Sequence, residues 1–140
     1  MQSKQDIIRT LALEPHPEGG YFRRTYKNDD GPITQNGQNR GHATAIYYLH
    51  DGGTFSRWHR TDGDELWFWH AGAPLMLEIK EAGDVVTTKR LGCNFSNNEH
   101  PQHLVPKNQW QRAKSEGEWT LVSCSVSPGF LFDTFEMDDS

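Results

Sequence analysis

The spacing of apolar residues along the chain changes close to Gly20. Before this point the apolar positions recur with a helical period, and Ser3 and Asp6 have the spacing of an N-terminal capping box. The pattern predicts one short amphipathic helix of about two to three turns. The following segment, 14–20, holds two prolines and a Gly-Gly pair, which cannot continue a helix. The apolar positions of the helix are Ile7, Ile8, Leu11 and Leu13.

After Gly20 the chain consists of short runs rich in aromatic and β-branched residues, separated by Gly, Asp, Asn and Pro. Such runs predict β-strands. Two polar stretches, Asp29–Gly41 and Asn94–His100, predict exposed loops. Many short strands with turn signals between them are typical of a β-sandwich or barrel, so we expect an all-β fold with a short N-terminal helix. The expected strands are Tyr21–Tyr26, Thr44–His50, Thr54–His59, Glu65–His70, Leu75–Lys80, Val85–Leu91, Gln102–Val105, Gln109–Ala113 and Trp119–Val126.

Length and composition narrow the class of protein. A chain of 140 residues without an internal repeat indicates one domain over 1–140, with the helix and its following loop over about 1–19 and a barrel over 20–136. The net charge of -5, with 14 basic and 19 acidic side chains and no cluster of Lys and Arg, disfavours a nucleic-acid partner. No apolar run predicts a signal peptide or a membrane span. Cys93 and Cys124 form no CxxC motif, and we expect a cytoplasmic protein with both thiols reduced.

The stretch 56–72 carries the candidate chemistry. Alternate residues of a strand share a face, so His59 and Thr61 project to the same side. The turn formed by Asp62-Gly63-Asp64 then brings Glu65 back to that side. A histidine and a carboxylate are therefore predicted to face each other.

Two tryptophans extend this face. Trp67 and Trp69 follow Glu65 at alternate positions and would form an aromatic floor, a surface that suits a ring-shaped or sugar-like ligand. Both rings can equally be core residues, since aromatic residues favour strands. His59 can likewise be a strand histidine bonded to a neighbour, and His70, on the opposite face, is better explained by packing in a dimer. Two roles are open for three residues of the segment that leads into the barrel. They can hold this segment over the barrel or line the mouth of the pocket, and they are Glu18, Tyr21 and Arg23.

The same stretch resembles the first motif of the cupin superfamily, which has two closely spaced histidines, then a glutamate and a glycine. Here His59 takes the first histidine place, Thr61 the second, Glu65 the glutamate place and Gly72 the glycine place. The second cupin motif, Pro-x-Gly-x-x-His, is matched by Pro106-Lys107-Asn108-Gln109-Trp110-Gln111. Asn108 replaces the glycine of this motif, a tolerable change because asparagine also adopts left-handed backbone geometry. Gln111 replaces its metal-binding histidine. Of the superfamily's metal-ligand places, only those of His59 and Glu65 keep the superfamily residue.

The resemblance is closer to one branch of small cupins, sometimes called cupin type five, and it covers nearly the whole chain. It implies a double-stranded β-helix, or jelly-roll cupin barrel, usually a homodimer and similar to the sugar-nucleotide epimerase cupins. It does not imply an assigned reaction. One departure is Phe68, where the branch often has histidine. The recurring phrases of the branch stand here as Pro15–Arg23, Thr44–Leu49, Trp58–Arg60, Trp67–Gly72, Pro101–Gln102, Val105–Pro106 and Ser127–Phe130.

We interpret the chain as a small-molecule-binding cupin for a sugar or nucleotide-sugar-like ligand, with isomerase or epimerase activity as the candidate reaction. His59 and Glu65 are the candidate catalytic residues: His59 would transfer a proton, and Glu65 would orient it or polarise the ligand. No cofactor is assigned. The candidate ligand-binding residues are Thr61, Trp67, Trp69 and Gln111.

Two alternatives stay open. The barrel can be a non-catalytic ligand-binding module, or a metal-dependent cupin enzyme such as an oxygenase or a metal-assisted isomerase. A divalent metal would be held by His59, Glu65 and Gln111, but neutral side chains such as Thr61 and Gln111 are weak ligands, which predicts low metal affinity. We expect a homodimer, because the strand edge at Tyr21–Tyr26 needs a cover.

Overall fold

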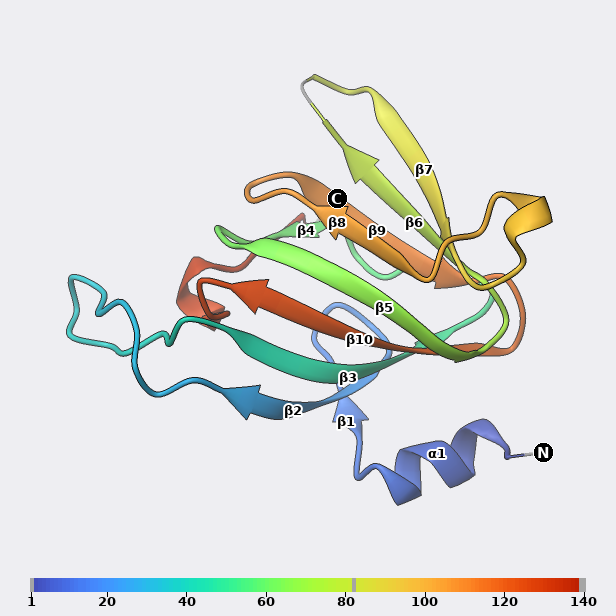
Figure 1. The fold of residues 1–140 in the computed structure, drawn as a ribbon, viewed down its shortest axis with the longest axis horizontal. Helices are drawn as coiled ribbons and strands as arrows, with labels where there is room; N and C mark the ends of the chain where they lie inside the picture. Colours follow the sequence, from blue (N-terminus) through green and yellow to red (C-terminus); the bar gives the residue numbers. More distant parts are fainter. Residues whose placement is uncertain (1, 82, 139–140) are drawn as a thin grey trace.

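The computed structural model describes residues 2–81 and 83–138, which form two antiparallel β-sheets and one short α-helix (Figure 1). The predicted fold class is confirmed. The helix is α1 (Lys4–Thr10), and two short 3-10 helices are η1 (Phe95–Asn97) and η2 (Phe132–Thr134). The strands are β1 (Glu14–Pro15), β2 (Tyr21–Lys27), β3 (Thr44–Asp51), β4 (His59–Arg60), β5 (Asp64–Gly72), β6 (Leu75–Lys80), β7 (Val86–Leu91), β8 (Gln102–Val105), β9 (Trp110–Ser115), β10 (Trp119–Ser127) and β11 (Glu136–Met137).

The two sheets face each other. The six-stranded sheet has the order β1-β2-β3-β10-β5-β8, and the five-stranded sheet has the order β11-β4-β9-β6-β7. Strands that are distant in sequence therefore lie side by side, as in jelly-roll barrels. β10, for example, pairs with β3 on one side and with β5 on the other. No helix among the described residues is long and apolar enough to cross a membrane.

The core lies between the sheets, because buried and partly exposed side chains alternate along the strands. In β6 the residues Leu75, Leu77 and Ile79 are buried and point inward, while their neighbours are partly exposed. On β5 the fully buried Trp67 packs against them from the opposite sheet. Each such side chain stabilises the fold by about 1.5–3 kcal/mol through removal of apolar surface from water.

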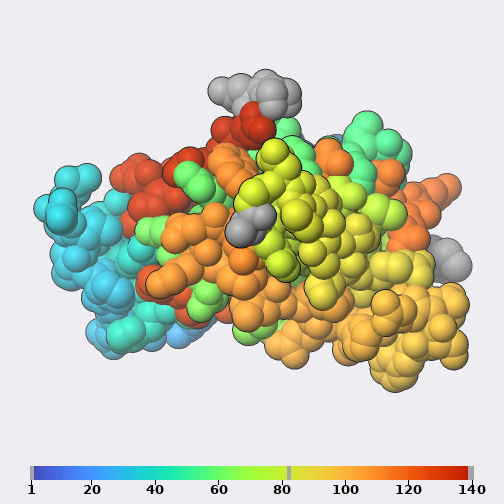
Figure 2. Space-filling view, turned by 90° about the horizontal axis from the view of Figure 1, so that it is seen from above, coloured from blue at the N-terminus to red at the C-terminus, as the bar shows by residue number. Residues whose placement is uncertain are grey.

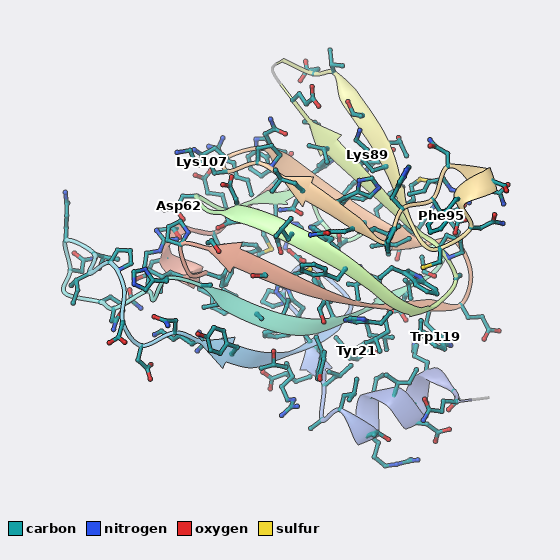
Figure 3. All side chains as sticks on the ribbon, viewed as in Figure 1. Tyr21, Asp62, Lys89, Phe95, Lys107 and Trp119 are labelled. Carbon is teal, nitrogen blue, oxygen red and sulfur yellow. The ribbon has the colours of Figure 1, made fainter. Side chains whose placement is uncertain are left out.

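The predicted N-terminal helix is confirmed and covers the outer face of the six-stranded sheet (Figure 1). Ser3 is its N-cap: the Ser3 hydroxyl accepts from the Asp6 backbone N–H, and the Asp6 carboxylate accepts from the Ser3 N–H. Apolar residues of the helix form a second small core with Leu49 of β3. Tyr21 and Trp119 belong to this cluster and lie between the sheet and α1 (Figure 3).

One predicted strand is wrong for most of its length. Within Thr54–His59, only His59 is in a strand. The preceding residues cross between the sheets: the Ser56 N–H donates to the Ala113 carbonyl, and the Arg57 N–H donates to the Glu18 carbonyl. These two bonds go to different parts of the molecule, so the segment has no continuous strand partner. The other predicted strands are present, and their ends lie within two residues of the predicted limits. The strands β1 and β11 were not predicted.

Two segments project from the barrel (Figure 2). The polar loop between β2 and β3 lies at one end, and the segment between β7 and β8 lies at the other. The first is tied to the barrel by Arg40, whose guanidinium forms a two-bond pair with the Asp62 carboxylate at 2.6 and 3.0 Å. Arg40 Nε also donates to the Gly129 carbonyl at 2.8 Å. The loop, the β4–β5 turn and the C-terminal segment thereby meet at one end of the barrel.

Candidate functional site

A cavity of about 380 Å³ opens at this end of the barrel. Buried polar side chains form one part of its wall: Glu18, Tyr48, His59, Thr61, Glu65 and Cys124. Apolar side chains form another: Phe22, Ile46, Phe130, Leu131, Phe132 and Phe135. The charged, more exposed lining residues are Glu14, Arg24, Lys27 and Asp133.

The C-terminal segment closes one side of the cavity. Phe130, Phe132 and Phe135 pack on one another edge to face, with ring centroids 4.9–5.9 Å apart. The Phe130 N–H donates to the Thr44 hydroxyl of β3, which anchors the start of this segment. At its other end β11 pairs with β4, where Met137 lies opposite His59. The aromatic wall of the cavity therefore comes largely from residues at the end of the chain.

His59 lies at the start of β4 and is 3 % exposed. Its Nδ1 lies 2.9 Å from the Arg57 carbonyl oxygen, which accepts the Nδ1–H hydrogen bond. Glu18 Oε2 also lies 2.9 Å from Nδ1, but outside hydrogen-bonding geometry, so this contact is electrostatic. Two oxygens beside Nδ1 require that this nitrogen carries a proton. Nε2 has no hydrogen-bonding partner among the described residues and is the nitrogen available to the cavity that His59 lines.

Glu18 reaches this position through a tight turn between β1 and β2. Gly19 and Gly20 both have positive φ, at 114° and 75°, a backbone conformation that other residues rarely adopt. A Cβ on Gly20 would also lie 2.6 Å from the Leu49 carbonyl oxygen. The Glu18 N–H donates to His16 Nδ1 at 3.1 Å. The turn thus inserts a carboxylate, only 3 % exposed, between the sheets.

Tyr48 of β3 holds the Glu18 side chain. The Tyr48 hydroxyl donates to Glu18 Oε1 and lies 2.7 Å from the Gly19 carbonyl oxygen. Burial, followed by the Glu18 charge, raises the pKa of Tyr48 well above its usual value, so the phenol stays a donor. The ring of His16 stacks on the Tyr48 ring at a centroid distance of 5.1 Å. Glu18 is therefore held in place by Tyr48 on β3 and by His16 in the turn between β1 and β2.

The charges of Glu18 and His59 stabilise each other. Burial alone would raise the pKa of Glu18, but the nearby His59 outweighs this effect and the net pKa lies below its ordinary value. Burial alone would lower the pKa of His59, but the Glu18 carboxylate outweighs it and the net pKa lies above its ordinary value. The Glu18 carboxylate thus favours the imidazolium form of His59 and makes His59 a stronger base.

Glu65 stands in different surroundings. Its carboxyl Oε1 accepts from Gln111 Nε2 at 2.8 Å, and the Cys124 thiol is a further hydrogen-bonding neighbour. Burial raises the pKa of Glu65 to about 7. The sequence leaves two roles open for Glu65, orienting His59 or polarising the ligand. The carboxylate that lies against His59 Nδ1 is that of Glu18.

Thr61 lies where the sequence predicts. It is buried, lines the cavity with His59 and Glu65, and its hydroxyl lies 3.4 Å from the Gly63 N–H. The Thr61 carbonyl accepts from the N–H of Asn108, which has a left-handed φ of 68°. The residue that stands at the glycine place of the second cupin motif therefore adopts the conformation expected of that place.

Trp67, Trp69 and Gln111 lie behind the cavity wall within the part of the chain that the structure describes. Trp67 shares a face with Glu65, as predicted, but it is fully buried and its indole Nε1–H donates to Gln111 Oε1 at 2.9 Å. Trp69 Nε1 donates to the carbonyl of Ala73, which lies in the short segment between β5 and β6. Strand alternation predicts the face of a residue but not its depth, which explains the difference. Direct ligand contact by these three residues stays a prediction.

The donor set does not fit a divalent metal ion. Among residues 2–81 and 83–138, no three His, Cys, Asp or Glu side chains are placed to hold one. Gln111 stands close to Glu65, but its amide oxygen is already taken by the Trp67 N–H and its nitrogen by Glu65. Thr61 adds only a neutral hydroxyl, a weak ligand. No metal-dependent step is therefore assigned to these residues.

The sequence does not predict the roles of two residues of the site. It leaves Glu18 either holding the leading segment over the barrel or lining the pocket mouth, and it places Tyr48 only within a strand. The Pro17-Glu18-Gly19-Gly20 run was the available signal, because a carboxylate before two glycines marks a turn that can enter a narrow space.

A double-sheet barrel with a buried histidine and carboxylates around one cavity is characteristic of cupins. The sequence profile described as Cupin superfamily (DUF985) matches residues 5–138, and the chain belongs to this family. A search of curated proteins finds no match.

Solved structures agree with this assignment. A protein from Shewanella oneidensis is 37 % identical with a TM-score of 0.90, covering 99 % of this chain and 85 % of its own. A hypothetical protein from Leishmania major is 30 % identical with a TM-score of 0.87, covering 98 % of this chain and 88 % of its own. Oxalate decarboxylase from Bacillus subtilis is 11 % identical with a TM-score of 0.64, covering 88 % of this chain and 29 % of its own, a likeness of fold alone.

Proposed function

We propose that the protein binds a small, sugar-like molecule in its cavity and catalyses a metal-independent proton transfer on it, as in an isomerase or epimerase. The observation that carries the proposal is the fixed tautomer of His59. Nδ1–H is bound to the Arg57 carbonyl beside the Glu18 carboxylate, which leaves Nε2 for a ligand. A base held in this way can take a proton from a ligand, and the nearby carboxylate stabilises the resulting cation.

The cavity supports the ligand class. Its volume of about 380 Å³ falls within the range of about 300–1,000 Å³ that is typical of small-molecule sites. Hydroxyl, carboxyl and imidazole groups on one wall suit a ligand with several oxygens, and Phe22 and Phe135 on another suit the apolar face of a sugar ring. The larger part of a nucleotide sugar would extend through the open end of the cavity.

Compartment and assembly belong to the same proposal. Cys93 is an exposed free thiol and Cys124 a buried one. An exposed free thiol persists best in a reducing compartment, so we propose that the protein acts in the cytoplasm. We also propose that it is a homodimer that binds neither nucleic acid nor membrane.

A two-stage experiment tests the activity. A thermal-shift screen against sugars, nucleotide sugars and small carboxylic acids identifies ligands, and proton NMR in D2O then follows C–H exchange of each hit. Exchange that is lost in His59→Gln but kept in His70→Gln supports the proposal. His70 is a suitable control because it is exposed on the outer face of β5, 2.6 Å from the Ser123 hydroxyl. Ligand binding without exchange would instead indicate the non-catalytic binding module.

A further inference from the structure

Three buried side chains form a hydrogen-bonded chain that ends at the cavity. Trp67 Nε1 donates to Gln111 Oε1 at 2.9 Å, and Gln111 Nε2 donates to Glu65 Oε1 at 2.8 Å. An indole N–H can only donate, so it fixes which end of the Gln111 amide is the acceptor. The amide nitrogen must then face Glu65. This arrangement defines Glu65 Oε1 as an acceptor and leaves Oε2 as the oxygen on which a proton can reside.

The neighbours of Glu65 compensate a negative charge only in part. Its hydrogen-bonding neighbours are the neutral Gln111 amide and the Cys124 thiol, a weak donor. Of the charged groups that face it, His59 favours the ionised carboxyl without forming an ion pair with it, and Glu18, with a smaller effect, disfavours it. With 7 % of the residue exposed, burial dominates and raises the pKa of Glu65 to about 7. The two buried carboxyls of the cavity therefore differ: Glu18 is ionised, and Glu65 keeps its proton below about pH 7.

We propose that Glu65 acts as a neutral carboxylic acid that donates from Oε2 to the carbonyl oxygen of an α-hydroxycarbonyl ligand, such as a ketose or aldose in its open form. Trp67 and Gln111 are the positioning residues that keep this proton directed into the cavity. This inference rests on the proposed function, because it needs His59 as the base.

The chemistry of one acid and one base in one cavity selects this ligand class. His59 Nε2 takes the proton from the carbon next to the carbonyl, and the C–H electron pair forms a carbon–carbon double bond. The carbonyl π pair moves to oxygen, which receives the Glu65 proton and yields an enediol. Return of a proton from His59 to either carbon, with return of an enol proton to Glu65, gives the isomer or the epimer. Atoms and electrons balance, and no oxidant, reductant or metal is needed.

The reaction needs a neutral His59 and a protonated Glu65 in the same molecule, a combination that a fraction of the molecules holds near neutral pH. When His59 becomes an imidazolium, Glu18 stabilises it at 2.9 Å. If Glu65 were ionised, the enediolate oxygen would face a second negative charge in a buried site. Pairs of titratable groups whose surroundings separate their protonation states are the usual means by which one site holds an acid and a base.

Infrared spectroscopy tests the protonation state directly. The difference spectrum between the wild type and Glu65→Gln should show the C=O stretch of a protonated carboxylic acid at about pH 6, and this band should disappear as the pH rises through about 7. Glu18→Gln should not remove the band, since Glu18 is the ionised carboxyl. Absence of the band at about pH 6 overturns the inference.

Proton exchange tests the role. The probes are dihydroxyacetone, erythrulose and fructose, with the exchange of the hydrogens next to the carbonyl followed by proton NMR in D2O. Glu65→Gln should slow exchange by about 100-fold or more, because an amide donates a hydrogen bond but cannot transfer the proton. Trp67→Phe should slow it by about ten-fold, because a Gln111 amide that is free to turn can draw the Glu65 proton away from the ligand.

The control for Trp67→Phe is Trp110→Phe. Trp110 precedes Gln111 on β9, but its ring lies on the outer surface under the Arg60 guanidinium, 4.8 Å from the ring centroid. Exchange should be unchanged in this variant. Gln111→Met breaks the same chain from its other side and should slow exchange like Trp67→Phe, with the fold of each variant checked by circular dichroism.

The outcomes separate this inference from the proposed function. Loss of exchange in His59→Gln together with rates within about two-fold of wild type in Glu65→Gln leaves the proposed function standing and overturns the role of Glu65. Exchange that is absent with all three ketoses in the wild type overturns the ligand class. Exchange lost in both variants, with the infrared band present, supports both.

Discussion

His59 Nδ1 lies 2.9 Å from Glu18 Oε2, although His59 begins β4 and Glu18 lies in the turn before β2. The two residues come from different sheets, so the contact exists only when the barrel has closed. Both are 3 % exposed, and charges at such depth interact strongly because little water screens them. Stability and the proposed proton transfer therefore both depend on this pair.

We predict that Glu18→Gln lowers the free energy of unfolding by about 3–5 kcal/mol at about pH 6, because it leaves a buried charge at His59 without its partner. The pKa of Glu18 is lowered from 4.5, so its contribution is present above about pH 4.5 and is lost as the pH falls. The pKa of His59 is raised from 6.5, so its contribution is present below about pH 6.5 and is lost as the pH rises through the folded-state pKa. Urea denaturation at about pH 4, pH 6 and pH 9 measures both contributions, and the loss in the variant should be largest at pH 6.

A double-mutant cycle isolates the pair. Glu18→Gln, His59→Gln and the double variant should show a coupling energy above about 0.5 kcal/mol at pH 6. Glu118→Gln, a charge removal at the exposed start of β10, is the matched control and should change stability little. Additive effects of the two site substitutions would contradict the coupling.

We predict that Glu65→Gln stabilises the protein at alkaline pH. The folded-state pKa of Glu65 is raised from 4.5 to about 7, so its favourable contribution is full below about pH 4.5 and is lost as the pH rises through 7. The difference corresponds to about 3 kcal/mol. Glutamine can still accept from Gln111, so only the charge is removed. Thermal denaturation should show a higher Tm for the variant at about pH 8.5 and no gain at about pH 4.5; equal Tm values at both would contradict the buried charge.

We predict that His50 contributes to acid sensitivity. His50 is 2 % exposed, and its Nε2 has no hydrogen-bonding partner among the described residues. It borders a second, small cavity of about 40 Å³. Burial lowers its pKa to about 4, an effect opposed by Glu18 and Asp51 and assisted by His59 and His16.

The sign follows from the unfolded chain, in which histidine titrates near 6.5. Stability from His50 is present above about pH 6.5 and falls by about 3 kcal/mol as the pH is lowered to about 4. His50→Phe keeps a ring beside Tyr48, whose centroid lies 4.0 Å away, and removes the titration. Its urea midpoint should fall less than that of wild type between pH 7 and pH 4.5. His100→Gln, at an exposed histidine, should behave as wild type.

We predict that the wild type purifies with well below one divalent metal per chain, and that Thr61→His with Gln111→His creates a site. His59, Thr61 and Glu65 line one cavity, and Gln111 lies opposite His59 in the β4–β9 register. The variant should bind Ni, Zn or Mn and gain thermal stability, because metal binds the folded form. Elemental analysis and thermal shift measure this. Stoichiometric metal in the wild type would contradict the first part, and a folded variant without metal affinity the second.

We predict a homodimer formed at the edge of β2. β1 pairs only with Tyr21 and Phe22, and beyond them no other described strand covers that edge of β2. Tyr26, near the end of the strand, is 51 % exposed. An open strand edge of this kind favours pairing across a two-fold axis. Light scattering at micromolar concentration should give the mass of two chains, and a strict monomer would contradict the prediction.

Local pattern accounts for most of the fold and for one side of the site. Runs of aromatic and β-branched residues between turn residues predicted the strands. Alternation along them put His59, Thr61 and Glu65 on one inner face, because side-chain direction on a strand depends only on neighbouring residues. The turn at 62–64 was predictable as well, because Asp-Gly-Asp is a local turn signal. Pattern failed at Thr54–Trp58, where a threonine and two aromatic residues suggest a strand but the Ser56 and Arg57 N–H groups find partners in different parts of the molecule.

The sequence by itself determined that this chain is a β-barrel of the cupin type with a histidine and a carboxylate on its inner surface. Only the tertiary structure decided that Glu18 contacts His59, that Trp67 and Gln111 stand behind Glu65, and that the C-terminal aromatic residues close the cavity. Alternation along a strand specifies a face, but depth and partner depend on how the sheets pack and where the connecting segments cross. Those relations join residues far apart in the chain, and the chemistry proposed for the cavity depends on them.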